Sequence, residues 1–589
     1  MTDLERLEEA KRRRPGAGEV ARLLRSLRER RFSDAGTLIR FHDTLLFLRA
    51  YPHSGTVMKL AEDILSSFAS RVASLAASGA DLSPFDHPEV SGIAGTSVTT
   101  DYSYDVVLWL KKRFGRHVAI DWEGYEGADR LRTALPPWLP LLEEEAIEDA
   151  NVPYREYLGQ ARARGEDDLS WLLSRIAAMR LPPAERAERY DAMGLSLCWR
   201  LAAGIVTRTR MRSPARRIFF HDAPLITRRD VSLEAEVASA PLPIRRLPRK
   251  EALAVLETTR EATALRYREY YAFTFGDPSA VLQADAGRGL LIYLIGTQRG
   301  RRLPLRSGYG GFLVKNGVPI GYFEALAFFE RMELGFNLYY AFREGESAWI
   351  FARSVKFLRQ ALGVTSFSLD PYQIGYENEE AISSGAFWFY RKLGFRSTDA
   401  RLSDLTAREE EKLAADPSYR TPASVLRRLA THNLLYEVAL PRHPEERPPC
   451  LPEERSDEGS APVRNPQLTT HNSQLSWDSF HIRNIALAVT RRMAREFGGG
   501  AEKIRRASEA SVARALGVNP RRWSREEREA FAGFALVLGL VPDLPRWKRD
   551  EKQALVEVVR AKAGPRESRY LHLLQRHARL RAAVIRLGS

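Results

Sequence analysis

Cysteine is scarce in this chain, because only Cys198 and Cys450 occur among 589 residues. A disulfide framework and a cysteine metal site are therefore excluded, as is usual for cytosolic proteins. Long apolar runs are also missing, since the longest, Phe531 to Val541, is too short to cross a bilayer. The charged opening segment lacks the apolar core of a secretory signal. We expect a cytoplasmic protein with no membrane segment.

Length and charge limit the architecture and the partners. A chain of 589 residues exceeds what one hydrophobic core holds, so about three folded units are expected. The net charge is +15, from 90 basic and 75 acidic residues, which favours polyanionic partners such as nucleic acid, acidic protein or a phosphorylated cofactor. The arginines are spread along the whole chain and form no single patch, which favours composition alone over nucleic-acid binding as the explanation of this charge.

The pattern along the chain predicts a multidomain α+β protein with four regions. Residues 1–230 have mostly helical periodicity, with a small α/β part near 90–125. Residues 442–475 are rich in Pro, Glu, Arg and Ser and indicate a disordered linker. Residues 476–589 predict a basic, all-α C-terminal domain, with helices over 482–497, 501–516, 525–540 and 548–563. No metal site is expected, because the acidic residues of 121–149 are typical of a solvated helix face.

The remaining region, residues 231–441, alternates between strand and helix patterns. Asn316-Gly317 is a strong signal for a tight hairpin turn between two apolar strands. Around it we expect strands over 242–247, 290–296, 311–315, 318–325, 332–340, 366–369 and 433–440, and helices over 250–272, 348–361 and 381–392. This order predicts a central mixed sheet flanked by helices.

The segment Ser384 to Arg396 carries the best single motif, Ser-Gly-Ala-Phe-Trp-Phe-Tyr-Arg-Lys-Leu-Gly-Phe-Arg. Together with the element order of residues 241–441, it resembles the GNAT (N-acetyltransferase-like) superfamily. The matching positions are Ala386, Tyr390, Lys392, Gly394 and Phe395. The same residues are also typical of an ordinary packed helix that ends at a glycine cap.

The resemblance implies acetyl-CoA or another acyl-CoA as co-substrate, with its pyrophosphate on a loop before a helix N-terminus. Here that loop is Arg343 to Ala348, in which Glu346 stands where the family has its central glycine and Gly345 comes one residue early. Two acids in the loop would repel a pyrophosphate. The implied cofactor-binding residues are Tyr339, Tyr340, Arg343, Gly345, Ser347, Ala348 and Ser383.

Catalysis by such a domain needs a base for the amine and an acid for the departing thiolate. The resemblance implies Glu333 as base, with Glu324 and Glu330 as competitors, and Tyr390 as acid. We expect an N-acyltransferase whose acceptor is an amine-bearing small molecule or protein.

Other functions stay open at this point. One alternative is a catalytically degenerate GNAT-fold protein that binds or senses a ligand. Another is a nucleic-acid-associated protein that uses its basic helical tail. A transferase that takes an aminoacyl group from charged tRNA would account for both the basic surface and the poor loop, but no motif supports it.

Overall fold

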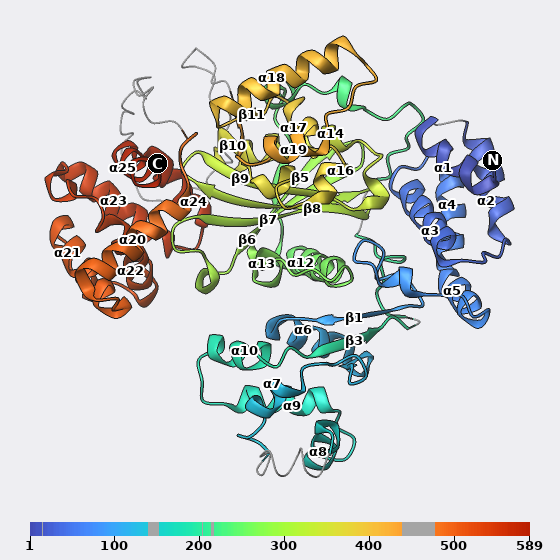
Figure 1. Cartoon of the computed structure of the whole chain (residues 1–589), viewed down its shortest axis with the longest axis horizontal. Helices are drawn as coiled ribbons and strands as arrows, with labels where there is room; N and C mark the ends of the chain where they lie inside the picture. Colours follow the sequence, from blue (N-terminus) through green and yellow to red (C-terminus); the bar gives the residue numbers. More distant parts are fainter. Residues whose placement is uncertain (14–15, 140–151, 203, 214–216, 439–476) are drawn as a thin grey trace.

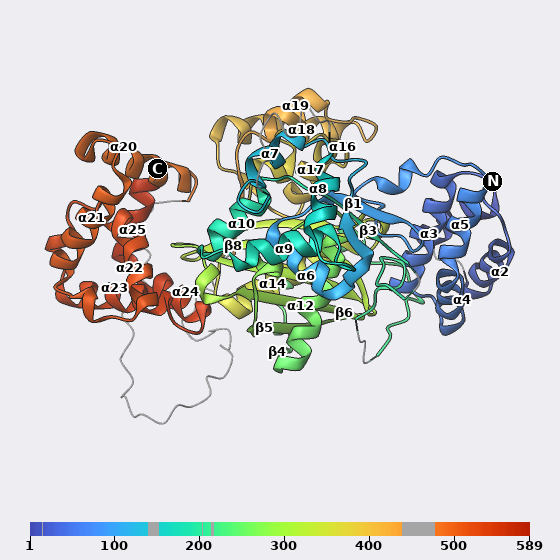
Figure 2. The same cartoon turned by 90° about the horizontal axis from the view of Figure 1, so that it is seen from below.

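The computed structural model describes the chain except residues 14–15, 140–151, 203, 214–216 and 439–476. Its centre is a nine-stranded mixed sheet in the order β11-β12-β10-β9-β8-β7-β6-β5-β4. The N-terminal helices lie at one end of this sheet and the C-terminal helices at the other (Figure 1, Figure 2). The architecture is therefore mixed α and β, with many helices around one large sheet.

Strands β4 to β9 pair antiparallel with their neighbours, β9 and β10 pair in parallel, and β12 is antiparallel to both β10 and β11. The predicted hairpin between β7 and β8 is confirmed, with positive φ at Asn316 (49°) and Gly317 (81°). The strands are β4 (Ile244–Arg246), β5 (Gly276–Gly287), β6 (Leu290–Thr297), β7 (Ser307–Lys315), β8 (Val318–Phe328), β9 (Arg331–Leu338), β10 (Ser366–Leu369), β11 (Arg396–Ser397) and β12 (Leu434–Glu437).

Helices cover both faces of the sheet (Figure 1). On one face, Phe273 of α13 packs over Gly310 of β7. On the other, Phe351 of α14 packs edge-on against Phe336 of β9. The helices of this region are α12 (Arg249–Ala264), α13 (Tyr271–Thr274), α14 (Ser347–Leu362), α15 (Pro371–Ile374), α16 (Glu379–Ser383), α17 (Ala386–Arg391), α18 (Ala400–Ala415) and α19 (Ala423–Leu429).

Several predicted elements differ from the structure. The helix expected over 381–392 is divided into α16 and α17, because Gly385 adopts a left-handed conformation with φ of 70°. The helix expected over 250–272 ends at Ala264, and Tyr267 then adopts a positive φ of 55°, which a helix cannot continue. Strand β5 was not predicted. The strand expected over 332–340 ends at Leu338, and Tyr340 begins a short 3-10 helix, η6 (Tyr340–Phe342).

The N-terminal region contains a helical bundle and a small sheet. The bundle consists of α1 (Asp3–Arg13), α2 (Ala17–Arg28), α3 (Ala35–Ala50), α4 (Gly55–Ser66) and α5 (Phe68–Ala77). The sheet has the order β1-β3-β2, so the α/β part expected near 90–125 takes its middle strand from residues 196–200. Its elements are β1 (Ser97–Asp101), α6 (Tyr104–Phe114), β2 (Val118–Ile120), α7 (Ala128–Ala134), α8 (Tyr154–Ala161), α9 (Asp168–Ala178), α10 (Pro183–Asp191) and β3 (Ser196–Arg200).

The C-terminal region is helical and packs against the sheet through an apolar cluster that includes Phe328, Phe329 and Trp477. Its helices are α20 (Ile482–Phe497), α21 (Ala501–Leu516), α22 (Arg525–Leu538), α23 (Arg549–Lys562), α24 (Glu567–Arg576) and α25 (Ala578–Gly588). The linker expected over 442–475 lies outside the described residues. Within the described ranges, no helix is both long and apolar enough to span a membrane.

Candidate functional site

The two parallel strands in the middle of the sheet separate after a short paired stretch. Residues 331 to 333 of β9 lie opposite residues 366 to 368 of β10. Beyond Glu333, β9 continues to Leu338, whereas β10 ends at Leu369 and leads into α15. Residues 334 to 338 of β9 are therefore not paired with β10, and we call this unpaired stretch the β9–β10 opening.

Two side chains from different elements meet at this opening. The Gln373 amide of α15 donates a hydrogen bond to the Phe336 carbonyl of β9 (3.0 Å) and lies 3.3 Å from the Tyr390 hydroxyl of α17. Phe351 and Phe395 hold the Tyr390 ring, with centroids 5.4 and 5.9 Å away. Burial raises the pKa of Tyr390 above its ordinary range. This phenol is therefore protonated at neutral pH and held at the opening.

A charged pair follows directly after β9. The Arg343 guanidinium lies 2.7 Å from the Glu380 carboxylate of α16 and stacks over the Tyr340 ring at 3.9 Å. The same guanidinium donates to the Leu338 carbonyl (3.0 Å) and to the Asn337 side chain (3.4 Å). Arg343 thus fixes the end of β9 to α16.

Three large aromatic side chains of this part of the chain stay exposed. Tyr340 is 38% exposed, Tyr372 59% and Tyr376 44%. Tyr372 and Tyr376 flank Gln373 in the chain, and Tyr340 follows β9. Exposed aromatic groups beside a polar site are typical of ligand contacts.

The candidate bases differ in their surroundings. Glu333 sits at the last paired position of β9, opposite Ser368, and forms an ion pair with Arg306 at 3.7 Å. Glu330 is occupied by structural contacts, because it accepts hydrogen bonds from Trp477 and Arg581 (both 2.7 Å) of the C-terminal region.

Glu324 of β8 has the most suitable position for a base. Its neighbours across the sheet are Gly310 on β7 and Gly335 on β9. Phe273 covers Gly310, whereas a side-chain carbon at Gly335 would meet only Gln373, at 3.6 Å. The Glu324 residue is exposed, yet the surrounding protein still displaces enough water to raise the pKa of its carboxyl. This carboxylate therefore lies beside the opening.

The loop expected to hold a pyrophosphate is built around a buried carboxylate. Glu346 is fully buried, lies 2.8 Å from the Lys315 ammonium and 2.5 Å from the Arg288 guanidinium, and accepts from the Ile226 amide. Burial by itself would raise the pKa of Glu346, but Lys315 and Arg288 outweigh it and lower that pKa. The carboxylate therefore holds the loop in place by three contacts.

The N-terminal bundle also covers this loop. A side-chain carbon at Gly345 would lie only 2.5 Å from the Tyr51 hydroxyl, which follows α3. Lys11 of α1 forms an ion pair with Glu344 at 3.2 Å. Tyr51 packs closely above Gly345, and the Glu346 carboxylate lies at the centre of the loop. Neither feature fits a bound pyrophosphate.

The other predicted cofactor residues are scattered around the opening. Tyr339 is buried beneath the Arg266 guanidinium, 3.7 Å from its ring centre. Ser347 donates to the Arg343 carbonyl (2.7 Å), Ala348 is buried, and Ser383 is exposed and donates to its own helix. The structure therefore brings together Tyr340, Arg343 and Tyr390, and not Gly345, Ser347, Ala348 or Ser383.

Sequence reasoning missed Gln373, Asn337 and Arg268. The Asn337 amide donates to the Tyr322 hydroxyl (3.0 Å), which also accepts from Arg268 (2.8 Å). The one available signal was amide residues placed at or after strand ends, and it is weak. The described residues hold no group of three His, Cys, Asp or Glu side chains placed to bind a metal. Comparison with family models, with curated proteins and with solved structures found no match to this chain.

Proposed function

We propose that the protein transfers an acyl group from a thioester to an amine at the β9–β10 opening, in the manner of GNAT enzymes. The observation that supports this most is the opening itself, an edge of β9 free of β10 that meets a buried phenol and a carboxylate of raised pKa. A free strand edge can hydrogen-bond to the amide groups of an extended ligand. The phenol and the carboxylate supply an acid and a base.

In this proposal the amine approaches from the Glu324 side of the sheet. Its nitrogen attacks the thioester carbonyl carbon, a C–N bond forms and the C–S bond breaks. Glu324 takes the proton that the amine loses, and the departing thiolate takes a proton from Tyr390. Glu333, the base that the family resemblance implies, lies at the closed end of the opening and is engaged by Arg306. We therefore assign the base role to Glu324.

Recognition of the acyl donor does not rest on the loop from Arg343 to Ala348, because Glu346 and Tyr51 leave no place there for a pyrophosphate. A thioester that lacks the nucleotide part should therefore serve about as well as acetyl-CoA. This property would separate the protein from an acyltransferase that binds its cofactor by the phosphates.

The test is a thiol-release assay on the full-length chain, with S-acetylpantetheine and acetyl-CoA as donors and primary amines as acceptors. We expect amine-dependent release, with the two donors within about tenfold of each other. A preference for acetyl-CoA of about a hundredfold or more would contradict a donor site that does not use the loop.

A second candidate function is a binding or sensing protein of the same architecture without turnover. The buried contacts of Glu346 with Lys315 and Arg288 favour it, because they remove the loop on which GNAT catalysis is expected to depend. Binding of S-acetylpantetheine without thiol release, across the amine panel, would support this candidate.

A further inference from the structure

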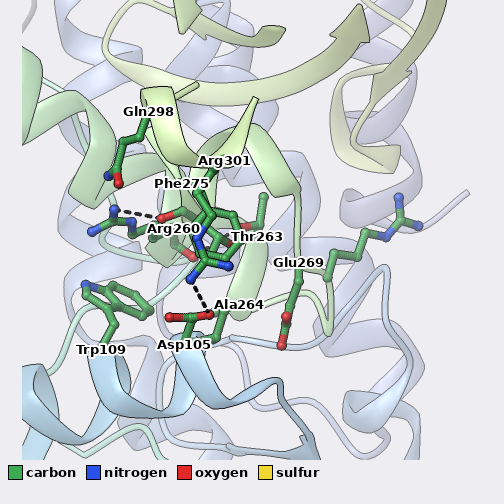
Figure 3. Close-up of a pocket in the computed structure, with 12 residues that line it drawn as sticks. Asp105, Trp109, Arg260, Thr263, Ala264, Glu269, Phe275, Gln298 and Arg301 are labelled. Atoms are coloured by element: carbon green, nitrogen blue, oxygen red, sulfur yellow. Dashed lines mark hydrogen bonds and ion pairs between the residues drawn. The ribbon is translucent and has the colours of Figure 1, made fainter. Parts of the chain in front are cut away.

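A pocket separate from the β9–β10 opening lies between α6 of the small-sheet region and α12 and α13 (Figure 3). Its volume is about 240 Å³, and its walls include Trp109, Val106, Ala264 and Phe275 as apolar surfaces. The Trp109 ring is fixed, because its indole N–H donates to Glu257 (2.9 Å). The pocket is therefore preformed and of a size for a small molecule.

Three arginines line the pocket, and the guanidinium groups of two of them are committed to other partners. Arg260 donates to the Phe273 and Thr274 carbonyls and to Glu257. Arg268 donates to the Tyr322 hydroxyl and to the Glu89 carboxylate (2.6 Å). These two groups shape the wall and have few donors left for a ligand.

Arg301 is the exception. Its guanidinium stacks on the Phe275 ring at 4.1 Å and makes no side-chain hydrogen bond within the described part of the chain. Arg301 forms an ion pair with Asp105 at 3.6 Å, a distance too long for a good hydrogen bond (Figure 3). A guanidinium held on an aromatic face with open edges is suited to a carboxylate.

Two carboxylates line the same pocket, Asp105 on α6 and Glu269 after α12. The Glu269 carboxylate accepts from the Ser103 amide (2.7 Å) and the Ser103 hydroxyl (2.5 Å), so both of its oxygens are held in place and keep further lone pairs. A ligand that is only anionic would face these two acids, and a ligand that is only cationic would face Arg301. The charges therefore select a ligand that carries both signs.

We propose that this pocket binds an α-amino acid or a zwitterion of similar size. Its carboxylate pairs with Arg301, its ammonium with Asp105 and Glu269, and its apolar side chain packs on Trp109 and Phe275. The inference does not depend on acyl transfer, because it concerns binding in the absence of a donor.

The test is calorimetric titration of the full-length chain with L-leucine and L-phenylalanine, and with 3-phenylpropionate and 2-phenylethylamine as analogues of single charge. We expect at least one amino acid to bind, and each single-charge analogue to bind about tenfold more weakly or worse. Arg301→Gln should weaken amino-acid binding by about tenfold and leave 2-phenylethylamine unaffected. Arg299→Gln, an exposed arginine of the same turn outside the pocket lining, is the matched control.

Asp105→Asn gives the reciprocal result, with weaker binding of L-phenylalanine and unchanged binding of 3-phenylpropionate. Thermal unfolding of each variant shows that it is folded before it is titrated. The proposal is overturned if no amino acid binds at millimolar concentration, or if amino-acid binding persists unchanged in Arg301→Gln.

Discussion

Two glutamates separated by one glycine, Glu344 and Glu346, show how position alone decides the role of a carboxylate. Both were predicted to repel a pyrophosphate. Glu344 is partly exposed and pairs with Lys11, whereas Glu346 is buried between Lys315 and Arg288. Lys315 is itself fully buried. The sequence could predict that Glu346 occupies a glycine position, but not the two cations, which come from β7 and from the turn before β6.

Removal of the Glu346 charge should destabilise the whole chain. In Glu346→Gln, the buried Lys315 loses its carboxylate, and we expect a loss of about 3–5 kcal/mol in the free energy of unfolding. Glu344→Gln, the matched control, should cost less than about 1 kcal/mol. Urea unfolding measures both, and equal losses would contradict the structural role of Glu346.

The same carboxylate gives a pH dependence of stability. Because the folded pKa of Glu346 is below its ordinary value, its stabilisation is present above the unfolded pKa and is lost as pH falls through the folded pKa. Thermal unfolding between neutral pH and pH ~3 should therefore show a smaller loss of stability in Glu346→Gln than in the wild type. Parallel curves for the two proteins would argue against this assignment.

Glu324 gives a prediction on the rate. A base works only when ionised, so the acyl-transfer rate should rise with pH and level off above the raised pKa of Glu324. Glu324→Gln should lose that acid limb and about 10²–10⁴ in rate, whereas Glu333→Gln should keep the limb. If Glu333→Gln removes it instead, the base is Glu333, as the family resemblance implies.

At the scale of elements, the sequence predicted correctly those turns and helices whose conformation depends on a short stretch of chain. The Asn316-Gly317 turn and the first four C-terminal helices belong here, since turn chemistry and helix periodicity are local. The boundary after Ala264 was missed because Tyr267 takes a left-handed conformation that is unfavourable for tyrosine. Tertiary packing imposes that conformation, so sequence patterns do not reveal it.

The β9–β10 opening was beyond sequence reasoning for a related reason. Its groups come from β8, β9, α15 and α17, and only the pairing register shows that Glu324 lies beside Gly335. The motif predicted Tyr390, and Glu324 was named only as a competitor for the base. Gln373 gave only a weak signal, because an amide after a strand is common in loops.

A substitution at Gly335 tests whether the acyl donor binds at the β9–β10 opening. Gly335 lies in an extended strand, and a Cβ atom added there meets nothing closer than 3.6 Å, so Gly335→Val suits the backbone and adds bulk beside Glu324. We expect binding of S-acetylpantetheine to weaken by about tenfold or more. Gly308→Val, at another roomy strand glycine, should not weaken it. Equal binding by both variants would place the donor elsewhere.

At the scale of the whole molecule, the C-terminal helices pack directly against the central sheet and form hydrogen bonds with it. Arg331 of β9 donates to the Trp477 and Phe480 carbonyls (3.2 and 3.3 Å), and Tyr570 of α24 donates to the Leu305 carbonyl. Exposed arginines such as Arg505, Arg521 and Arg522 remain on the outer surface. Nucleic-acid binding by this region stays a prediction.

Truncation after residue 438 should therefore not leave a stable, monomeric domain. It would expose Phe328, Phe329 and Leu435, which pack against the C-terminal helices. An apolar patch of this kind on a sheet favours association. Size-exclusion chromatography with light scattering should show aggregates, and a soluble monomer with the melting temperature of the full chain would contradict the interlocked arrangement.

The most direct test of the central claim is amine-dependent thiol release from S-acetylpantetheine by the full-length chain, compared with Tyr390→Phe. Transfer at the β9–β10 opening predicts release that requires an amine and that falls by about 10²-fold or more in the variant. No release from S-acetylpantetheine or acetyl-CoA with any amine, from protein that unfolds cooperatively, would contradict the claim and leave the opening as a binding site.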